Sequence, residues 1–236
     1  MPYYITHNNL KIPYEDVGTG QVMLFIPGWT MSKRSFQKQL AALSKTWRVI
    51  TLDLRGQGDS EKKDLETIDF TDWAQDIHDL LLQLDLKEVV LVGWSLGTLV
   101  MWLYCQQYNY DRVAGLVHID MLAQLSGGWA EYKNTLINQD YREYLASFIE
   151  EMFMPTVSAK DQSFFLREAM KTPPILASSL LQVPRANNLQ DTSANWPGTS
   201  RTKTKPWSTK WISFENTSIM LRKLSPCNRT TPKSLV

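Results

Sequence analysis

The pentapeptide around Ser95 has residue types and a spacing that suit nucleophilic catalysis. Ser95 stands between two glycines in Gly93-Trp94-Ser95-Leu96-Gly97. An aliphatic run at 89–92 precedes it and a long apolar segment of helix formers follows it. This order predicts a strand, a sharp turn and a helix, which is the arrangement of a nucleophile elbow. A Cβ at Gly93 or Gly97 would collide with the neighbouring element in such a turn. The hydroxyl would then stand at a helix N-terminus, where unpaired N–H groups favour a developing oxyanion.

Two motifs upstream extend this pattern. Residues 27–30 read Pro-Gly-Trp-Thr after an apolar run, and residues 53–60 read Asp-Leu-Arg-Gly-Gln-Gly-Asp-Ser. With the elbow, they resemble the α/β-hydrolase superfamily, and the elbow is most similar to serine carboxylesterases of the haloperoxidase-like and pimeloyl-carrier methyl esterase-like groups. The resemblance covers roughly Tyr3 to Leu181. It implies acyl transfer through Ser95, because the dehalogenase and epoxide-hydrolase branches would carry Asp at this position.

The resemblance also implies an oxyanion hole made of backbone groups. Its donors would be the N–H of Leu96, after the nucleophile, and the N–H of Trp29, after Gly28. The family usually has His where this chain has Pro27. Because the donors are backbone groups, this difference should alter the rigidity of the loop more than the chemistry. Asp53 and Arg55 are expected to brace loops.

The partners that would activate the serine are missing from the pattern. The family places a catalytic Asp and then a catalytic His after two further parallel strands, whereas the only histidines here are His7, His78 and His118. His118 lies inside a predicted buried strand, where a structural role is the more usual reading. Asp120, at the end of that strand, is a candidate acid, although an aspartate there can also brace a loop. A serine hydroxyl without a base is a weak nucleophile.

Strands and helices alternate through the first half of the chain. After an expected hairpin of residues 3–6 and 11–16, apolar runs predict strands, and 3.6-residue periodicity predicts helices. The predicted strands are 22–26, 48–52, 89–92 and 113–120, and the predicted helices are 32–44 and 71–85. The fold class is therefore α/β, with a doubly wound, mostly parallel sheet. Ligands bind at the carboxyl ends of such strands, where Ser95, Trp29 and Asp120 would all lie.

Residues 121–182 are expected to form a helical lid. Helices rich in Tyr, Phe and Met are predicted at 129–153 and 160–170, with Pro155 between them. In the family, helices inserted at this point cover the nucleophile and supply an apolar acyl pocket. The alternative is two ordinary packing helices.

From Val183 the composition changes. The last 54 residues hold 15 Ser or Thr and five Pro, and no long periodic segment is apparent. We therefore expect residues 1–182 to be the α/β-hydrolase core, including the lid region, and residues 183–236 to be an irregular tail outside the family pattern, with the C-terminal strands missing or disordered. Two explanations compete, a divergent basic extension and a reading-frame shift near Leu181 to Arg185 that leaves the family sequence truncated.

Charge and cysteine content limit the partners and the cellular setting that are expected. The net charge is +1, and the basic excess is dispersed in the tail, so nucleic acid is not an expected partner. The uncharged run from Val89 is split by the turn at Ser95, so no membrane span is expected. Two cysteines and no signal peptide are typical of a cytoplasmic protein.

These observations favour a serine hydrolase acting on small-molecule carboxylic esters or thioesters through a Ser95 acyl-enzyme. Activity is expected to be impaired because the catalytic histidine is absent. No metal and no organic cofactor are implied. The alternatives are a non-catalytic small-ligand-binding protein with the same fold and a frameshifted remnant.

Overall fold

An eight-stranded sheet is the framework of the structure. The computed structural model describes residues 2–119, 140–153, 157–180, 209–214 and 217–222. Within these ranges the strand order is β1-β2-β4-β3-β5-β6-β8-β7. The four central strands are parallel, and antiparallel pairs flank them on both sides. The strands are β1 (Tyr3–Ile5), β2 (Lys11–Val17), β3 (Val22–Ile26), β4 (Arg48–Leu52), β5 (Val89–Trp94), β6 (Val113–Ile119), β7 (Thr209–Phe214) and β8 (Thr217–Arg222).

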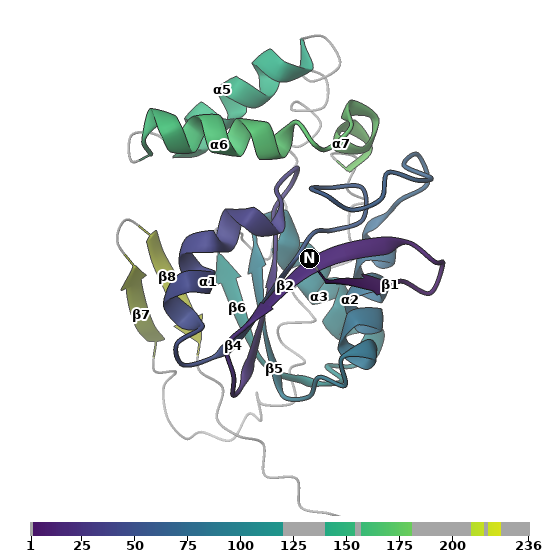
Figure 1. Ribbon diagram of the computed structural model, residues 1–236, viewed down its shortest axis with the longest axis vertical. Coiled ribbons are helices and arrows are strands. Elements are labelled where there is room, and N and C mark those ends of the chain that lie inside the picture. Colours follow the sequence, from purple (N-terminus) through teal and green to yellow (C-terminus); the bar gives the residue numbers. More distant parts are fainter. Residues whose placement is uncertain (1, 120–139, 154–156, 181–208, 215–216, 223–236) are drawn as a thin grey trace, which may run out of the picture.

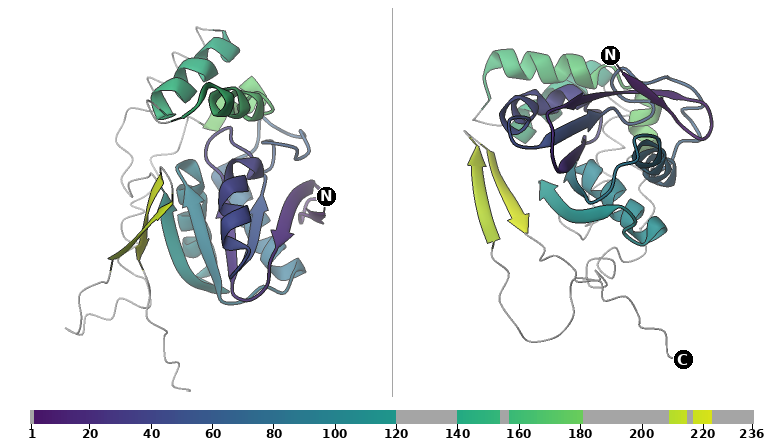
Figure 2. Two further views of the ribbon diagram at one scale, coloured as in Figure 1. Left: turned by 60° about the vertical axis from the view of Figure 1, so that its left-hand side comes forward. Right: turned by 60° about the horizontal axis from the view of Figure 1, so that its bottom comes forward.

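Helices cover both faces of the sheet and its upper end (Figures 1 and 2). Helix α1 packs on one face, α2 and α3 on the other, and α5 to α7 lie beyond the carboxyl ends of the parallel strands. The predicted α/β fold with a mostly parallel, doubly wound sheet is confirmed. The helices are η1, a 3-10 helix (Lys33–Phe36), α1 (Gln37–Leu43), α2 (Phe70–Gln83), α3 (Leu96–Tyr108), α5 (Tyr141–Phe153), α6 (Ala159–Ala169) and α7 (Pro174–Leu180).

The continuous apolar run of β3 is explained by burial on both sides. Successive side chains of a strand point to opposite faces. Met23 and Phe25 belong to the hydrophobic cluster on the α1 side, which contains Phe36, whereas Leu24 and Ile26 belong to the larger cluster on the α2 and α3 side. A strand covered by helices on both faces has no polar side, which is typical of parallel sheets.

Two predicted helices begin differently from expectation. Residues 32–44 form a 3-10 turn and then a short α-helix rather than one helix, because the backbone N–H and the ammonium group of Lys33 both bind Asp53 and fix the first turn. Helix α2 begins after Asp69, not at residue 71. The Asp69 carboxylate accepts the N–H groups of Thr71 and Asp72, and the Asp72 carboxylate accepts the N–H of Asp69. This reciprocal capping satisfies donors that a helix start leaves unpaired.

The part of the predicted lid that the structure describes is mainly helical. Helix α5 falls within the predicted segment 129–153, and α6 at 159–169 nearly coincides with the predicted segment 160–170. Residues 129–139 lie outside the described ranges, and α7 was not predicted. None of the described helices is both long and apolar enough to cross a membrane.

In the segment expected to be an irregular tail, the structure describes two strands, at residues 209–214 and 217–222. Strands β7 and β8 form an antiparallel hairpin, and β8 pairs antiparallel with the edge of β6 at Val117 and His118. This pairing satisfies backbone groups that the open edge of β6 would expose. The many threonines and serines suggested a loop, yet threonine and aromatic residues favour strands. These strands are not the parallel pair of the family pattern. The division at residue 182 and its reading-frame explanation stay predictions.

Candidate active site

Ser95 occupies a strained turn between β5 and α3. Its backbone angles are φ 48° and ψ −120°, a region that a residue with a Cβ rarely adopts and that costs about 1–3 kcal/mol. The Ser95 N–H donates to the carbonyl of Ile119, at the end of β6, over 2.8 Å. The hydroxyl does not cap the helix, and the residue is partly exposed. The turn therefore presents a side chain that the helix does not use.

The two elbow glycines lie where a side chain does not fit. A Cβ on Gly93 would lie 2.6 Å from the Cα of Thr98, and a Cβ on Gly97 would lie 2.3 Å from the carbonyl oxygen of Ile26. The obstacles are backbone atoms, which cannot turn aside. The Thr98 hydroxyl also donates to the Gly93 carbonyl over 2.8 Å. Strand β5, the loop after β3 and helix α3 therefore approach one another too closely for alanine.

Trp29 lies in the loop that packs against the elbow. A Cβ on Gly28, the preceding residue, would be 3.4 Å from the Cβ of Ser95. Leu96 is the first residue of α3. Within the described residues, neither the Trp29 N–H nor the Leu96 N–H has a hydrogen-bond acceptor. Two N–H groups flanking one serine are the donors that an oxyanion hole needs.

The Trp29 indole is held by the helices above it. Its N–H donates to the carbonyl of Ala177 in α7 over 3.0 Å. Its ring meets Tyr144 and Phe148 of α5 edge to face, with centroids 6.2 and 5.1 Å apart. Trp29 is 3% exposed. Helices α5 and α7 of the lid therefore fix the side chain of Trp29, whose backbone N–H is a candidate oxyanion donor.

The three histidines have other surroundings. His7 binds Asp79 and His78 stacks on Tyr108 with centroids 3.9 Å apart. His118 lies beside Gly93 in the sheet register and packs its ring against Trp102 at 4.8 Å. No hydrogen bond joins any of these rings to the Ser95 hydroxyl in the described part of the chain. Asp120, the candidate acid, lies outside the described residues, directly after Ile119.

A buried ionic cluster, which the sequence did not suggest, links the loops after β3 and β4. The fully buried Lys33 donates to Asp53 over 2.7 Å and to Asp59 over 3.0 Å. Asp53 also accepts the Asp59 N–H, so it braces its loop as expected. Burial raises the pKa of Asp59, but hydrogen bonds from Lys171 and Lys33 outweigh it and lower this pKa to about 2.

The same loops carry the anchors of the lid. The Ser32 hydroxyl donates to Glu168 of α6 over 2.6 Å, Lys171 donates to Asp59 over 2.8 Å, and the Thr172 hydroxyl donates to the carbonyl of Thr30. These partners are more than 100 positions apart in the chain, which is why sequence spacing could not indicate them.

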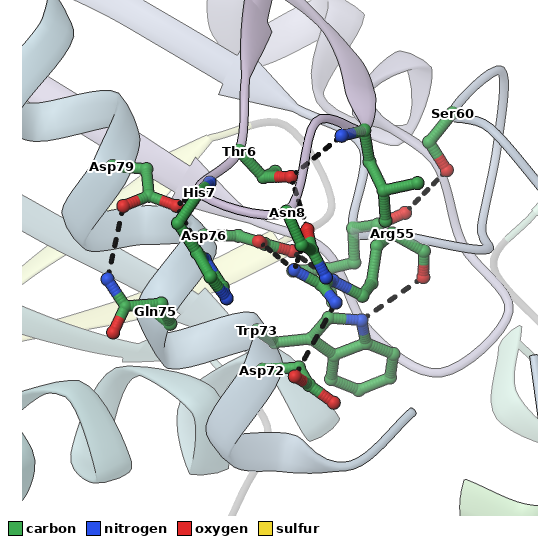
Figure 3. Close-up of polar contacts among 12 residues, drawn as sticks. Thr6, His7, Asn8, Arg55, Ser60, Asp72, Trp73, Gln75, Asp76 and Asp79 are labelled. Atoms are coloured by element: carbon green, nitrogen blue, oxygen red, sulfur yellow. Dashed lines mark hydrogen bonds and ion pairs between the residues drawn. The ribbon is translucent and has the colours of Figure 1, made fainter. Parts of the chain in front are cut away.

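Arg55 braces the loop after β4 against helix α2, as expected. Its guanidinium binds both carboxylate oxygens of Asp76 and lies 3.5 Å from Asp72, and its carbonyl accepts the Trp73 indole N–H (Figure 3). Burial raises the pKa of Asp76 to about 6, and the contact with Arg55 opposes a further rise.

Comparison with protein families gives one broad match. A family profile described as "alpha/beta hydrolase fold" matches residues 21–223, a range that runs past Leu181. An esterase from Exiguobacterium antarcticum superposes with a TM-score of 0.72 at 24% identity, covering 80% of this chain and 75% of that one, and so shares the fold.

Three curated relatives illustrate the range of named activities. A putative non-heme chloroperoxidase from Synechocystis is 40% identical over 44% of this chain and 38% of its own length. A soluble epoxide hydrolase from Corynebacterium is 26% identical over 66% and 64%. A pimeloyl-[acyl-carrier protein] methyl ester esterase from Vibrio cholerae is 25% identical over 67% and 63%. The match spans less than two thirds of the length of each of these relatives.

Proposed function

Because the chain belongs to the α/β-hydrolase family, we propose that Ser95 is its nucleophile and that its chemistry is acyl transfer from small carboxylic esters or thioesters. The conformation of Ser95 is the observation that supports this most. At φ 48° and ψ −120° the backbone lies outside the left-handed helical region that some non-glycine residues adopt, and strain of this kind is retained at functional turns. A structural serine has no need of it.

In the proposed reaction the Ser95 Oγ attacks the carbonyl carbon of the ester. The negative charge that forms on the carbonyl oxygen is received by the N–H groups of Trp29 and Leu96. Collapse of this intermediate breaks the bond to the alcohol or thiol, which leaves with the proton given up by the Ser95 hydroxyl, and an acyl group stays on Ser95. Water then attacks the acyl-enzyme, releases the carboxylic acid and returns a proton to the Ser95 oxygen. No metal or organic cofactor takes part.

Turnover by this chain is proposed to be strongly impaired. Both half-reactions need a base, and among the residues that the structure describes no hydrogen bond joins a histidine to the Ser95 hydroxyl. In subtilisin, loss of the triad histidine lowers turnover by about 10⁶-fold.

Two cysteines, of which Cys105 is buried and free, fit the proposed cytoplasmic setting.

The absence of a paired histidine favours one second candidate. The chain could hold a small apolar acyl ligand under the lid without converting it. Trp29, Phe148 and Tyr144 pack together as an aromatic cluster in which Trp29 belongs to the loop beside Ser95, and the proposed ligand would contact this apolar cluster.

Hydrolysis of a short activated aryl ester separates the two candidates. The wild type, Ser95→Ala and Ser178→Ala are compared; Ser178 is a half-buried serine of α7 whose hydroxyl donates to the carbonyl of Ile175. Nucleophilic catalysis predicts a slow rate and an acyl adduct on Ser95 by mass spectrometry, both lost only in Ser95→Ala. Equal rates and no adduct in all three would contradict the proposal, and ligand binding without turnover would support the second candidate.

A further inference from the structure

A cluster of ionisable side chains lies where the β1–β2 turn meets helix α2, outside the proposed reaction. His7 comes from the turn, and Asp76 and Asp79 come from successive turns of α2 (Figure 3). Each of the three offers one ligand atom, and these atoms all lie within 4.8 Å of one another. A histidine nitrogen with two carboxylate oxygens is a donor set suited to Zn²⁺ and similar divalent ions.

The spacing of the first two donors is close to that of two ligands on one ion. The His7 Nδ1 is 3.0 Å from the Asp79 Oδ2, a hydrogen-bond distance. Two ligands that bind a tetrahedral zinc ion at about 2.1 Å lie about 3.4 Å apart, so the two donors need to separate by only a few tenths of an ångström. Asp79 is also held in place, because it accepts the Gln75 side-chain amide over 3.1 Å and the His7 backbone N–H over 2.8 Å. Such outer contacts commonly orient metal ligands.

The charges of the cluster do not cancel. Three carboxylates, Asp72, Asp76 and Asp79, lie within two turns of α2, and Arg55 is the cation that contacts the first two. His7 adds a positive charge only when protonated. With His7 neutral, one guanidinium faces three carboxylates, so a dication would offset the remaining charge.

A buried hydroxyl without a hydrogen-bond partner among the described residues belongs to β1, the strand that precedes the His7 turn. Tyr4 is 2% exposed, and its hydroxyl has no hydrogen bond to the described part of the protein. Burial, and after it the charges of Asp76 and Asp79, raise the pKa of this hydroxyl, so both carboxylates act on it. Buried polar groups are nearly always bonded, so an unpaired one indicates a missing water or ion.

We propose that His7, Asp79 and Asp76 bind a divalent cation of the Zn²⁺ type, and that the Tyr4 hydroxyl bonds to a water molecule on that ion. His7 binds through Nδ1 as the neutral imidazole, and any proton on Nδ1 leaves to solvent. Asp76 contributes an oxygen lone pair that its Arg55 contact leaves available. The ion ties the N-terminal hairpin to α2, and this role does not depend on Ser95.

Calorimetric titration of the full chain with ZnCl₂ tests the site. The wild type is expected to bind one equivalent, and His7→Ala and Asp79→Asn are expected to weaken binding at least tenfold. His78→Ala and His118→Ala are matched controls, because they remove the other two histidines, and both should bind as the wild type does. Tyr4→Phe is expected to weaken binding several-fold without abolishing it.

Thermal unfolding of the same proteins guards against a folding artefact. Because a ligand of the folded state stabilises it, saturating Zn²⁺ should raise the Tm of the wild type and of both controls, and leave His7→Ala unchanged although it unfolds cooperatively without zinc. No binding by the wild type at millimolar Zn²⁺ would overturn the proposal. So would equal binding by His7→Ala and the wild type.

Discussion

The indole N–H of Trp29 donates to the carbonyl of Ala177 over 3.0 Å, so the residue beside the nucleophile is bound directly to lid helix α7. Both groups are buried. A lost partner would leave the Ala177 carbonyl unsatisfied, which costs about 1–3 kcal/mol.

Trp29→Phe should therefore lower the free energy of unfolding by more than the smaller ring alone explains. Trp102→Phe is the matched control, because Trp102 is equally buried and its indole N–H has no partner among the described residues. Urea denaturation should give a loss about 1–3 kcal/mol larger for Trp29→Phe. Equal losses would mean that the hydrogen bond contributes nothing.

Alanine at Gly93 should be much more harmful than alanine at Gly115, although the two glycines lie on neighbouring strands. A Cβ on Gly93 would be 2.6 Å from backbone, whereas a Cβ on Gly115 would meet Val90 at an ordinary 3.6 Å. We expect Gly93→Ala to lose about 1–3 kcal/mol of stability and Gly115→Ala to be neutral or stabilising. Chemical denaturation of both variants checks this, and similar stabilities would contradict the steric argument.

Backbone strain at Ser95 predicts that the glycine variant is more stable than the alanine variant there, the reverse of the usual order of stability. At φ 48°, Ser95→Gly should be more stable than Ser95→Ala by about 0.5–2 kcal/mol, because glycine removes the backbone strain. At Ser44, where φ is −62°, glycine should be the less stable of the two. Thermal unfolding of the four variants measures both differences, and the same order at both positions would refute strain at the elbow.

The ion pairs of Asp59 predict a defined pH dependence. The folded-state pKa of about 2 lies below the ordinary value of 3.8 for an aspartate, so the ionised carboxylate stabilises the fold above pH 4 and loses this effect as the pH falls toward 2. Asp59→Asn should be less stable than the wild type at pH 6, and the difference should shrink toward pH 3. Asp64→Asn, at an exposed aspartate, should show no such trend in urea titrations. A difference that grows as the pH falls would contradict the assignment.

Features encoded within a short stretch could be predicted from the sequence. Strand β3 has the predicted limits because its apolar run is continuous and ends at a proline, and β4 has them because its residues favour strands and end at an aspartate. The elbow could be placed at Ser95 because its glycines and flanking apolar runs are all local.

Features that depend on distant partners could not be predicted. Lys33 looks like an exposed residue of an amphipathic helix, yet it is fully buried because Asp53 and Asp59 accept its ammonium group. His7 is 72 positions from Asp79, so no spacing in the sequence indicates their contact. The hairpin of β7 and β8 depends on the open edge of β6, which exists only once the sheet has formed.

The anchors of the lid have a consequence for how the protein unfolds. The bonds from Glu168, Lys171, Thr172 and Ala177 to the loops after β3 and β4 all fall within one short stretch, residues 168–177. This stretch should open only together with the sheet, as part of one cooperative unit. Its amide protons should therefore exchange with solvent as slowly as those of β3, while the exposed first turn of α6 exchanges much faster through local fraying.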